Sequence, residues 1–375
     1  MKLQYKLGIA LFLLASFCAG LKANDLTRRE FTKVIKKEYD ISKNGTTAIF
    51  NKYGKVDIKT WDRNRVKIDV TIIVNAASED VAQKVFDRID INFYADANYV
   101  KAETSIKPFK KEWWDWRGVN ESDYTINYEV YMPPTNNLEL TNKYGDSYIA
   151  PMEGKLSLDV KYGNFKAQAV KNNAKITLGY GSGTLESAQN LMSTISYSKL
   201  YLGEVSDAEI MSSYSRLTIE KAANLRTNSK YDNYEVSKLR EFRNEGKYDS
   251  FKIGQADNVV VIGKYSQVNV GKLLSLLDLN LEYGGAGVLA VSKDFSSINL
   301  VGKYTDFKIN VESGANFLLD ASATYAGIGY PAGLKVEREI EKGTSHEVKG
   351  HLGKEDARSK IIARLNYGGL KVRQE

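Results

Sequence analysis

An all-β fold, a parallel β-solenoid, is predicted by three features of this chain. A tyrosine returns every 17 or 18 residues through its middle. Apolar residues recur at fixed distances after each tyrosine. No proline lies between Pro151 and Pro331, as expected of stacked strands, because proline removes a hydrogen-bond donor from the sheet. A short fixed period indicates one structural unit stacked on copies of itself.

The first observation concerns the tyrosine column. We expect it to be a structural ladder of stacked, partly buried rings with their hydroxyls at the rim. The alternative is an aromatic stripe that binds sugars, which requires rings that face solvent. Tyr53 is an isolated forerunner of the column, and Tyr304, Tyr325 and Tyr367 are looser repeats after it. The regular members are Tyr144, Tyr162, Tyr180, Tyr197, Tyr214, Tyr231, Tyr248, Tyr265 and Tyr283.

The residues between the tyrosines predict strands and corners. The third and fifth positions after the tyrosine are apolar and the fourth is mostly polar, as in Leu217, Thr218 and Ile219, which is typical of a strand with one buried face. About 17 residues are too few for a strand and a crossover helix. Each coil is therefore predicted to be strand, corner, strand, corner, right-handed by the general preference of parallel crossovers. The tenth position favours a polar corner residue and the eleventh an apolar one, the members being Asn172, Asn190, Asp207, Asn224 and Asn258, and Leu191, Ala208, Leu225, Phe242, Val259 and Leu276.

Residues 1–23 are predicted to be a signal peptide, because Lys2 and Lys6 precede an apolar run over residues 7–19. Cys18 is the only cysteine and a less favourable lipidation site, since the bulky Phe17 precedes it. Cleavage after Ala23 removes three lysines and lowers the net charge from +7 to +4. The remaining charges alternate in sign, which does not support nucleic-acid binding. No later segment approaches 18 apolar residues, so we expect no transmembrane span. From the signal peptide we expect export to the periplasm, the outer-membrane surface or the exterior.

Three regions are predicted in the rest of the chain. Residues 24–143 form an N-terminal cap region with a coil-like unit at 46–74, a helix at 78–89 that begins at Ser78, and strands at 91–99 and 124–132. Residues 144–335 form the regular solenoid. Residues 336–375 form a C-terminal cap, because the last coils of a solenoid must cover an otherwise adhesive sheet edge; strands near 334–340 and 360–365 flank a charged insert with Gly343, Gly350 and Gly353.

A loop at residues 107–123 holds three of the chain's four tryptophans. If these rings are exposed, they form a contact surface for a glycan or a partner protein. If they are buried, they cover the open first coil. The candidate contact residues are Trp113, Trp114, Trp116, Lys110, Lys111 and Arg117.

Catalytic chemistry has little support. Asp232 and Asp249 lie one period apart and could form a carboxylate pair of the kind that hydrolyses glycosides, but aspartate beside the tyrosine is also a natural turn former. The two histidines, His346 and His351, lie in the charged insert. No spacing of acidic residues is typical of a calcium loop. We therefore expect no catalytic residue, cofactor or metal.

Four motifs resemble a bacterial adhesin family with tyrosine–glycine β-solenoid repeats. They are residues 51–56 with Trp61 and Asp62, residues 131–134, residues 138–146, and the closing residues 365–370. The resemblance implies an exported protein of a Gram-negative cell envelope and supplies no catalytic residues. The first hypothesis is a non-enzymatic binding surface for a polysaccharide or another envelope protein. The alternatives are a solenoid carbohydrate-active enzyme and a structural periplasmic scaffold.

Overall fold

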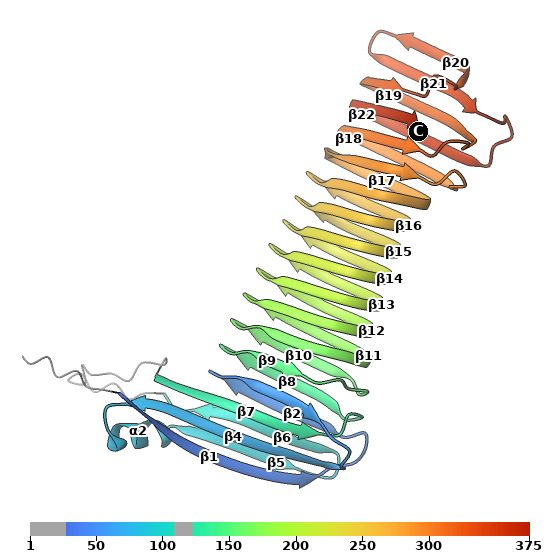
Figure 1. Ribbon diagram of the computed structural model, residues 1–375. Coiled ribbons are helices and arrows are strands. Elements are labelled where there is room, and N and C mark those ends of the chain that lie inside the picture. Colours follow the sequence, from blue (N-terminus) through green and yellow to red (C-terminus); the bar gives the residue numbers. More distant parts are fainter. Residues whose placement is uncertain (1–27, 109–122) are drawn as a thin grey trace, which may run out of the picture.

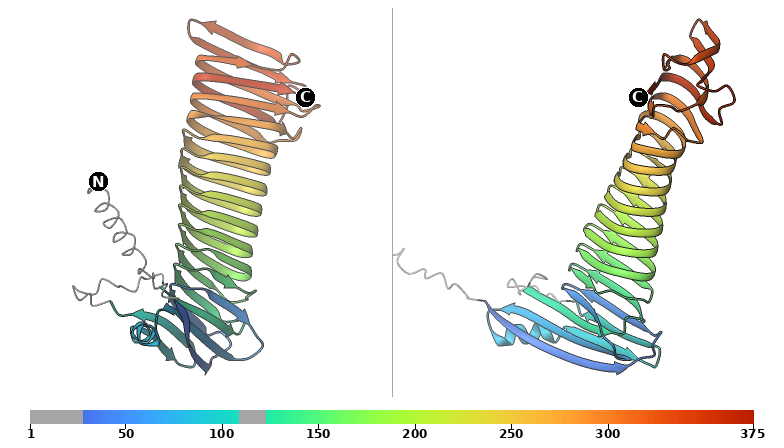
Figure 2. Two further views of the ribbon diagram at one scale, coloured as in Figure 1. Left: turned by 60° about the vertical axis from the view of Figure 1, so that its left-hand side comes forward. Right: turned by 45° about the vertical axis from the view of Figure 1, so that its right-hand side comes forward.

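The protein is an elongated rod of stacked β-strands (Figure 1). A computed structural model describes residues 28–108 and 123–375. Within these residues the strands form one 22-stranded sheet, and the single helix is α2 (Glu79–Phe86). The views in Figure 2 show the coils of the rod as flattened loops stacked along its length. The predicted all-β solenoid is confirmed, while the boundaries drawn between its three regions remain predictions.

The middle of the rod consists of in-register coils. Each strand pairs in parallel with the strand one period away, so that Leu202 lies between Leu185 and Ile219. Parallel neighbours lie about 4.8 Å apart, and this spacing sets the rise of each coil. The regular strands are β11 (Phe165–Gly179), β12 (Ser182–Ser196), β13 (Lys199–Ser213), β14 (Arg216–Lys230), β15 (Asn233–Lys247) and β16 (Ser250–Lys264).

A continuous hydrophobic core runs through the coils. The fifth residue after each tyrosine points inward, and Leu202, Ile219 and Ile253 are among those that are completely or almost completely buried. Burial of such side chains stabilises a fold by roughly 1.5–3 kcal/mol each. Because every coil presents the same inward columns, a residue packs against its equivalents in the coils above and below it.

Two irregular coils shift the predicted columns by one residue. A bulge in β11 places Asn173 opposite Asn190, so Asn173 rather than Asn172 belongs to the corner column. A second shift lies in β17 (Gln267–Val291), where Leu277 takes the inward position and is fully buried. Leu276, the predicted inward residue, is only partly buried. Both coils are 18 residues long, and the extra residue is accommodated by the bulge.

At the N-terminal end of the rod, further strands stack on the regular coils and extend its two faces. One face continues as β9 (Ser147–Ile149), β3 (Val56–Thr60), β7 (Tyr124–Met132), β4 (Arg65–Ala76) and β1 (Arg29–Asp40). The other continues as β10 (Leu156–Lys161), β8 (Asn137–Lys143), β2 (Thr46–Lys52), β6 (Tyr99–Ile106) and β5 (Ile89–Ala95). The pairs β1–β4, β4–β7 and β5–β6 are antiparallel, so the solenoid geometry ends here.

Helix α2 joins these two faces and covers the end of the core. The side chain of Ser78 accepts a hydrogen bond from the Val81 backbone N–H, as the sequence predicts. Ala82, Val85 and Phe86 are buried. The strand predicted at 91–99 is confirmed as β5, but β5 ends at Ala95. It ends there because Asp96 Oδ1 accepts the backbone N–H groups of Asn98 and Tyr99 and closes a turn between β5 and β6.

At the C-terminal end, chain order and spatial order differ. Strand β22 (Ser359–Gln374) lies between β18 (Ser297–Val311) and β19 (Phe317–Gly329), pairing in parallel with both. The hairpin of β20 (Lys335–Lys342) and β21 (Ser345–Leu352) is the outermost layer, antiparallel to β19. The predicted charged insert is thus largely strand β21, and the closing segment is not the last coil of the rod.

Candidate functional site

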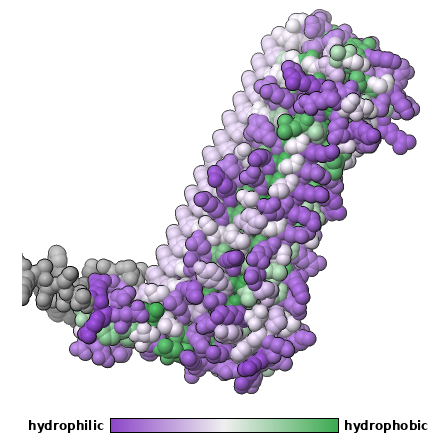
Figure 3. All heavy atoms as spheres, in the orientation of Figure 1, coloured by the Kyte–Doolittle hydropathy of each residue, from purple (hydrophilic) through white to green (hydrophobic). Residues whose placement is uncertain are grey.

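Thirteen tyrosines form one stack along an edge of the rod, and we call it the tyrosine ladder. Successive rings have centroids 4.6–5.1 Å apart and planes within 16° of parallel. In Figure 3 a regular row of residues of intermediate hydropathy follows one edge of the rod, as expected of stacked tyrosines. Its spatial order is Tyr53, Tyr144, Tyr162, Tyr180, Tyr197, Tyr214, Tyr231, Tyr248, Tyr265, Tyr283, Tyr304, Tyr367 and Tyr325.

Every ladder tyrosine adopts the left-handed backbone conformation, with φ between 51° and 66°. This conformation costs a residue with a side chain roughly 1–2 kcal/mol. Ring stacking offsets about 0.5–1.5 kcal/mol of that cost per pair. The backbone contributes as well, since the Tyr197 N–H donates to the Ser213 carbonyl of the next coil at 3.0 Å. The tyrosine is therefore the corner residue of each coil.

The residue after the tyrosine connects neighbouring corners in one of two ways. In the middle coils its side chain accepts a backbone N–H from the preceding corner: Ser215 Oγ from Ser198, and Asp232 Oδ1 from Ser215. At the glycine corners the backbones approach instead. A Cβ on Gly163 would lie 2.1 Å from the Gly145 carbonyl oxygen, so only glycine fits there.

Asp232 and Asp249 belong to this corner network. Asp249 accepts the Asp232 backbone N–H and the Ser229 hydroxyl, both at 2.9 Å. Asp232 accepts the Ser212 hydroxyl at 2.7 Å. The two aspartates are 1% and 3% exposed. Burial raises the pKa of Asp232, and it raises the pKa of Asp249 to about 6. Their oxygens are occupied by protein donors away from solvent, which favours the turn-forming interpretation over a hydrolytic pair.

The ladder rings are half exposed but their faces are covered. The side chains of the ladder tyrosines from Tyr144 to Tyr367 are between 37% and 56% exposed. The rings are thus partly buried, as the sequence predicts, and about half of each side chain meets solvent. Each interior ring nevertheless has a neighbouring ring on both faces, so only edges and hydroxyls meet solvent. A sugar stacks on the face of an aromatic ring, and this geometry therefore disfavours the sugar-binding stripe.

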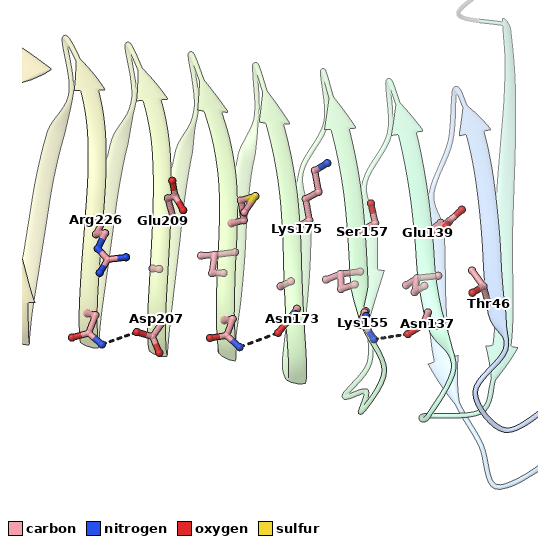
Figure 4. Close-up of a pocket in the computed structure, with 18 residues that line it drawn as sticks. Thr46, Asn137, Glu139, Lys155, Ser157, Asn173, Lys175, Asp207, Glu209 and Arg226 are labelled. Carbon is pink, nitrogen blue, oxygen red and sulfur yellow. Dashed lines mark hydrogen bonds between the residues drawn. The ribbon is translucent and has the colours of Figure 1, made fainter. Parts of the chain in front are cut away.

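A groove of about 530 Å³ lies elsewhere on the rod, across the seven stacked strands from β2 to β14 (Figure 4). It runs from Thr46 on β2 to Asn224 and Arg226 on β14. Six strand spacings of about 4.8 Å give it a length of roughly 29 Å. It crosses the strands, so an occupant would be an extended chain parallel to the rod.

One wall of the groove is the polar corner column. Asn190 donates to Asn173 at 2.9 Å and Asn224 donates to Asp207 at 2.6 Å. These pairs fix the amides while leaving further donors and acceptors free for a ligand. The opposite wall is formed by the residues two positions further on, and the floor by the strands between them. The wall residues are Asn137, Lys155, Asn173, Asn190, Asp207 and Asn224, facing Glu139, Ser157, Lys175, Met192, Glu209 and Arg226.

The groove lining is electrically balanced, with three acidic and three basic residues among those that form it. An anionic polymer needs an excess of cations, as nucleic-acid sites show. The lining also has no aromatic ring. The groove thus offers hydrogen bonds from its polar walls and apolar contact from residues such as Leu156, Leu191 and Met192.

The other predicted site residues lie either outside the described part of the chain or on the C-terminal hairpin. Trp113, Trp114, Trp116, Lys110, Lys111 and Arg117 lie outside the described residues. On the C-terminal hairpin, His346 Nε2 lies 2.9 Å from Glu339 Oε1 and 3.7 Å from Glu341 Oε1. One ligand atom from each of these three residues lies within 4.8 Å of the others, as in a metal-ligand set. The contact of His346 with Glu339 is also an ordinary hydrogen bond between neighbouring strands. His351 is buried and its Nδ1 contacts Glu337 Oε1 at 3.0 Å.

The groove was missed by sequence reasoning, although its signal was present. The polar tenth column marked one wall, and it was interpreted only as a corner. The alternation along each strand placed the second wall two residues later. The polar tenth column does not predict the N-terminal end of the groove. There Thr46 and Asn137 line the groove because β2 pairs with β8.

Several solved structures from bacteria are similar to parts of this fold. No family model matches the chain, and no match is found among curated proteins. A "putative cell adhesion protein" from Clostridium sporogenes is 9% identical, over 93% of this chain and 100% of that one, with a TM-score of 0.18. A "putative adhesin" from Bacteroides fragilis is 12% identical over 91% and 97%, with a TM-score of 0.24. Another "putative adhesin", from Parabacteroides distasonis, is 8% identical over 92% and 97%, with a TM-score of 0.27. Among the described residues there is no helix with the length and apolar character needed to cross a membrane.

Proposed function

We propose that this protein is a non-enzymatic, exported binding protein of the cell envelope whose groove holds an extended, neutral polysaccharide. The groove across seven strands is the observation that carries the proposal. Export rests on the signal peptide expected at residues 1–23. The adhesin-like resemblance of the motifs supports a role in binding rather than catalysis.

Three properties of the groove support a neutral polysaccharide. Its length suits a chain of several units. Its amide and hydroxyl groups, on Asn137, Ser157, Asn173, Asn190 and Asn224, match the hydroxyl groups of a sugar. Its charges cancel, which favours an uncharged chain over an acidic one. A peptide that lay across the strands would leave much of its own backbone without partners.

The test is binding of the mature chain, residues 24–375, to a panel of polysaccharides by affinity electrophoresis and calorimetry. The probes are neutral glucan, mannan and xylan, with alginate and hyaluronan as acidic comparisons. Replacing the hydrogen-bonded pair Asn173 and Asn190 by alanine removes two amides from the groove. We expect a roughly tenfold or larger loss of affinity, because each net hydrogen bond contributes about 0.5–1.5 kcal/mol.

Two further variants sharpen the result. Asn258→Ala with Asn269→Ala removes two amides outside the groove lining and is expected to bind like the wild type. The triple variant Trp113→Ala, Trp114→Ala, Trp116→Ala tests the alternative contact surface. Binding lost only in the tryptophan variant would overturn the groove assignment. Binding of none of the five polymers would favour an envelope-protein partner or a scaffold role.

A further inference from the structure

The tyrosine ladder is an unbroken series of twelve stacked ring pairs from Tyr53 to Tyr325. The proposed polysaccharide groove uses none of these residues. Continuity extends even to the irregular C-terminal end, where Tyr367 fills the place between Tyr304 and Tyr325. Stacking alone does not explain why the aromatic residue is tyrosine at every corner, because phenylalanine stacks in the same way.

The ladder hydroxyl groups from Tyr144 to Tyr367 face solvent. Within the described residues, no side-chain hydrogen bond joins a ladder hydroxyl from Tyr144 to Tyr367 to the protein, and these side chains are 37–56% exposed. Phenols in contact with water can release a proton when an electron is removed. The ladder therefore combines closely stacked rings with twelve exposed, oxidisable phenol groups.

We propose that the tyrosine ladder is an oxidation site, at which a one-electron oxidant generates phenoxyl radicals that couple neighbouring tyrosines into dityrosine. The oxidant removes one electron from each of two phenols, and each hydroxyl proton passes to water. A carbon–carbon bond then forms between ring carbons adjacent to the C–O carbons. The two hydrogens on those carbons move to the oxygens as the rings regain aromaticity. Two phenols thus lose two electrons and two protons, and two equivalents of oxidant are reduced.

The geometry favours coupling within one rod. Neighbouring centroids lie within 5.1 Å, and Tyr231 and Tyr248 lie only 4.6 Å apart. A radical on one ring always has a second phenol in contact with it. Tyr201 has no such neighbour: it is 39% exposed, but its strand neighbours are Thr184 and Thr218. The exposed Tyr94 has Tyr99 nearby, but their rings are further apart, at 6.3 Å, and tilted by 53°. Exposure is thus similar at the two kinds of site, and stacking is what differs.

Two variants with equal numbers of substitutions test this difference. The alternating variant replaces every second rung by phenylalanine, so that no two ladder tyrosines remain neighbours: Tyr144, Tyr180, Tyr214, Tyr248, Tyr283 and Tyr367. The block variant replaces six consecutive rungs and leaves five stacked tyrosine pairs: Tyr180, Tyr197, Tyr214, Tyr231, Tyr248 and Tyr265. Both keep thirteen stacked rings, and both keep Tyr53 with Tyr124, whose rings meet edge to face at 5.6 Å.

The experiment exposes dilute mature protein to photogenerated tris(bipyridine)ruthenium(III) as the one-electron oxidant. Dityrosine is measured by fluorescence in the monomer band and its partners are identified by mass spectrometry. We expect dityrosine in the wild type and the block variant, at pairs of neighbouring rungs, and its loss in the alternating variant. Equal yields in the two variants, or cross-links that join separate molecules through Tyr201 and disappear on dilution, would overturn the proposal.

Folding of each variant is checked by circular dichroism. If the alternating variant fails to fold, the wild-type map still decides the question. Cross-links confined to neighbouring rungs support the proposal, and oxidation spread equally over Tyr148, Tyr201 and the ladder contradicts it.

Discussion

The ring of Tyr304 stacks on Tyr367, with centroids 4.6 Å apart, although Tyr325 is the next ladder tyrosine along the chain. Tyr325 stacks on the other face of Tyr367 at 4.8 Å. The final strand thus supplies a rung between two rungs that precede it in sequence. Strand β22 completes the core at the same place, because Ala363 is fully buried and lies opposite both Leu300 and Ala321.

The inserted strand leads to a first prediction. Ala363→Asp buries a charge between β18 and β19 and is expected to expel β22, because an unpaired buried charge costs several kcal/mol. Hydrogen exchange should rise in β18, β19 and β22 and stay low in β11 to β15. Lys360→Asp, at an exposed position of the same strand, is the control and should preserve protection. Loss of protection along the whole rod would show that the C-terminal strands do not unfold independently.

The middle coils give a second prediction. Ile253 is 1% exposed on β16 and lies between Val236 and Val270. Ile253→Asp is expected to lower the free energy of unfolding by roughly 3–5 kcal/mol, because the carboxylate has no partner in the core. Thermal and urea unfolding measure the change. Asn269→Asp, on the outer face of β17, should differ little from wild type. An unchanged melting temperature for Ile253→Asp would contradict the inward register.

Corner packing gives a third. Gly163→Ala places a Cβ about 2.1 Å from the Gly145 carbonyl oxygen, and relieving this clash must separate two coils. We expect destabilisation of about 3 kcal/mol. Gly179→Ala is the matched control, since its Cβ would have no neighbour closer than 3.7 Å. That change should be neutral or slightly stabilising because alanine reduces the entropy of the unfolded chain. Similar melting temperatures for the two variants would refute the close approach of the corners.

The buried carboxyl of Asp249 predicts a dependence on pH. Burial raises its pKa to about 6 in the folded protein, whereas an unfolded aspartate titrates near 3.9. The folded state therefore binds the proton more tightly. This group stabilises the fold fully below about pH 4, and the contribution, at most about 3 kcal/mol, is lost as the pH rises through 6.

Asp249→Asn removes that titration. The difference in unfolding free energy between wild type and variant should change between pH 4 and pH 7, in the direction that favours the variant at the higher pH. The difference is the useful quantity, because salt-bridged carboxylates such as Glu235, whose pKa is lowered by Lys252, act in the opposite direction. A difference that stays constant over this range would contradict the raised pKa.

The repeat made the coils predictable, and it failed where contacts cease to be periodic. Each coil of the regular section buries the same columns, so Leu202 and Ile219 could be placed from spacing alone. The position of β22 could not, because the distance between tyrosines along the chain does not say which rung lies next to which in space. The bulges near Asn173 and Leu277 were missed for a related reason. The spacing of the tyrosines shows that a coil has one extra residue, but only side-chain packing determines where in the coil that residue lies.

The candidate surfaces were harder to predict than the fold. The tyrosine column was evident, but whether its rings stack face to face or face solvent depends on the corner conformation. The groove depends on β2, β8 and β10 lying side by side, and β2 and β8 are far apart in sequence.

The insertion of β22 also sets an order of assembly. The slot between β18 and β19 is made from residues that leave the ribosome, and any export channel, before the strand that fills it. Until residues 359–374 arrive, β18 and β19 present free edges to one another and to any other chain. A molecule that lacked β22 would keep the regular coils but would leave the facing edges of β18 and β19 unpaired. Residues 359–374 thus complete the C-terminal coils, and β18 and β19 stay unpaired with each other in a chain that lacks β22.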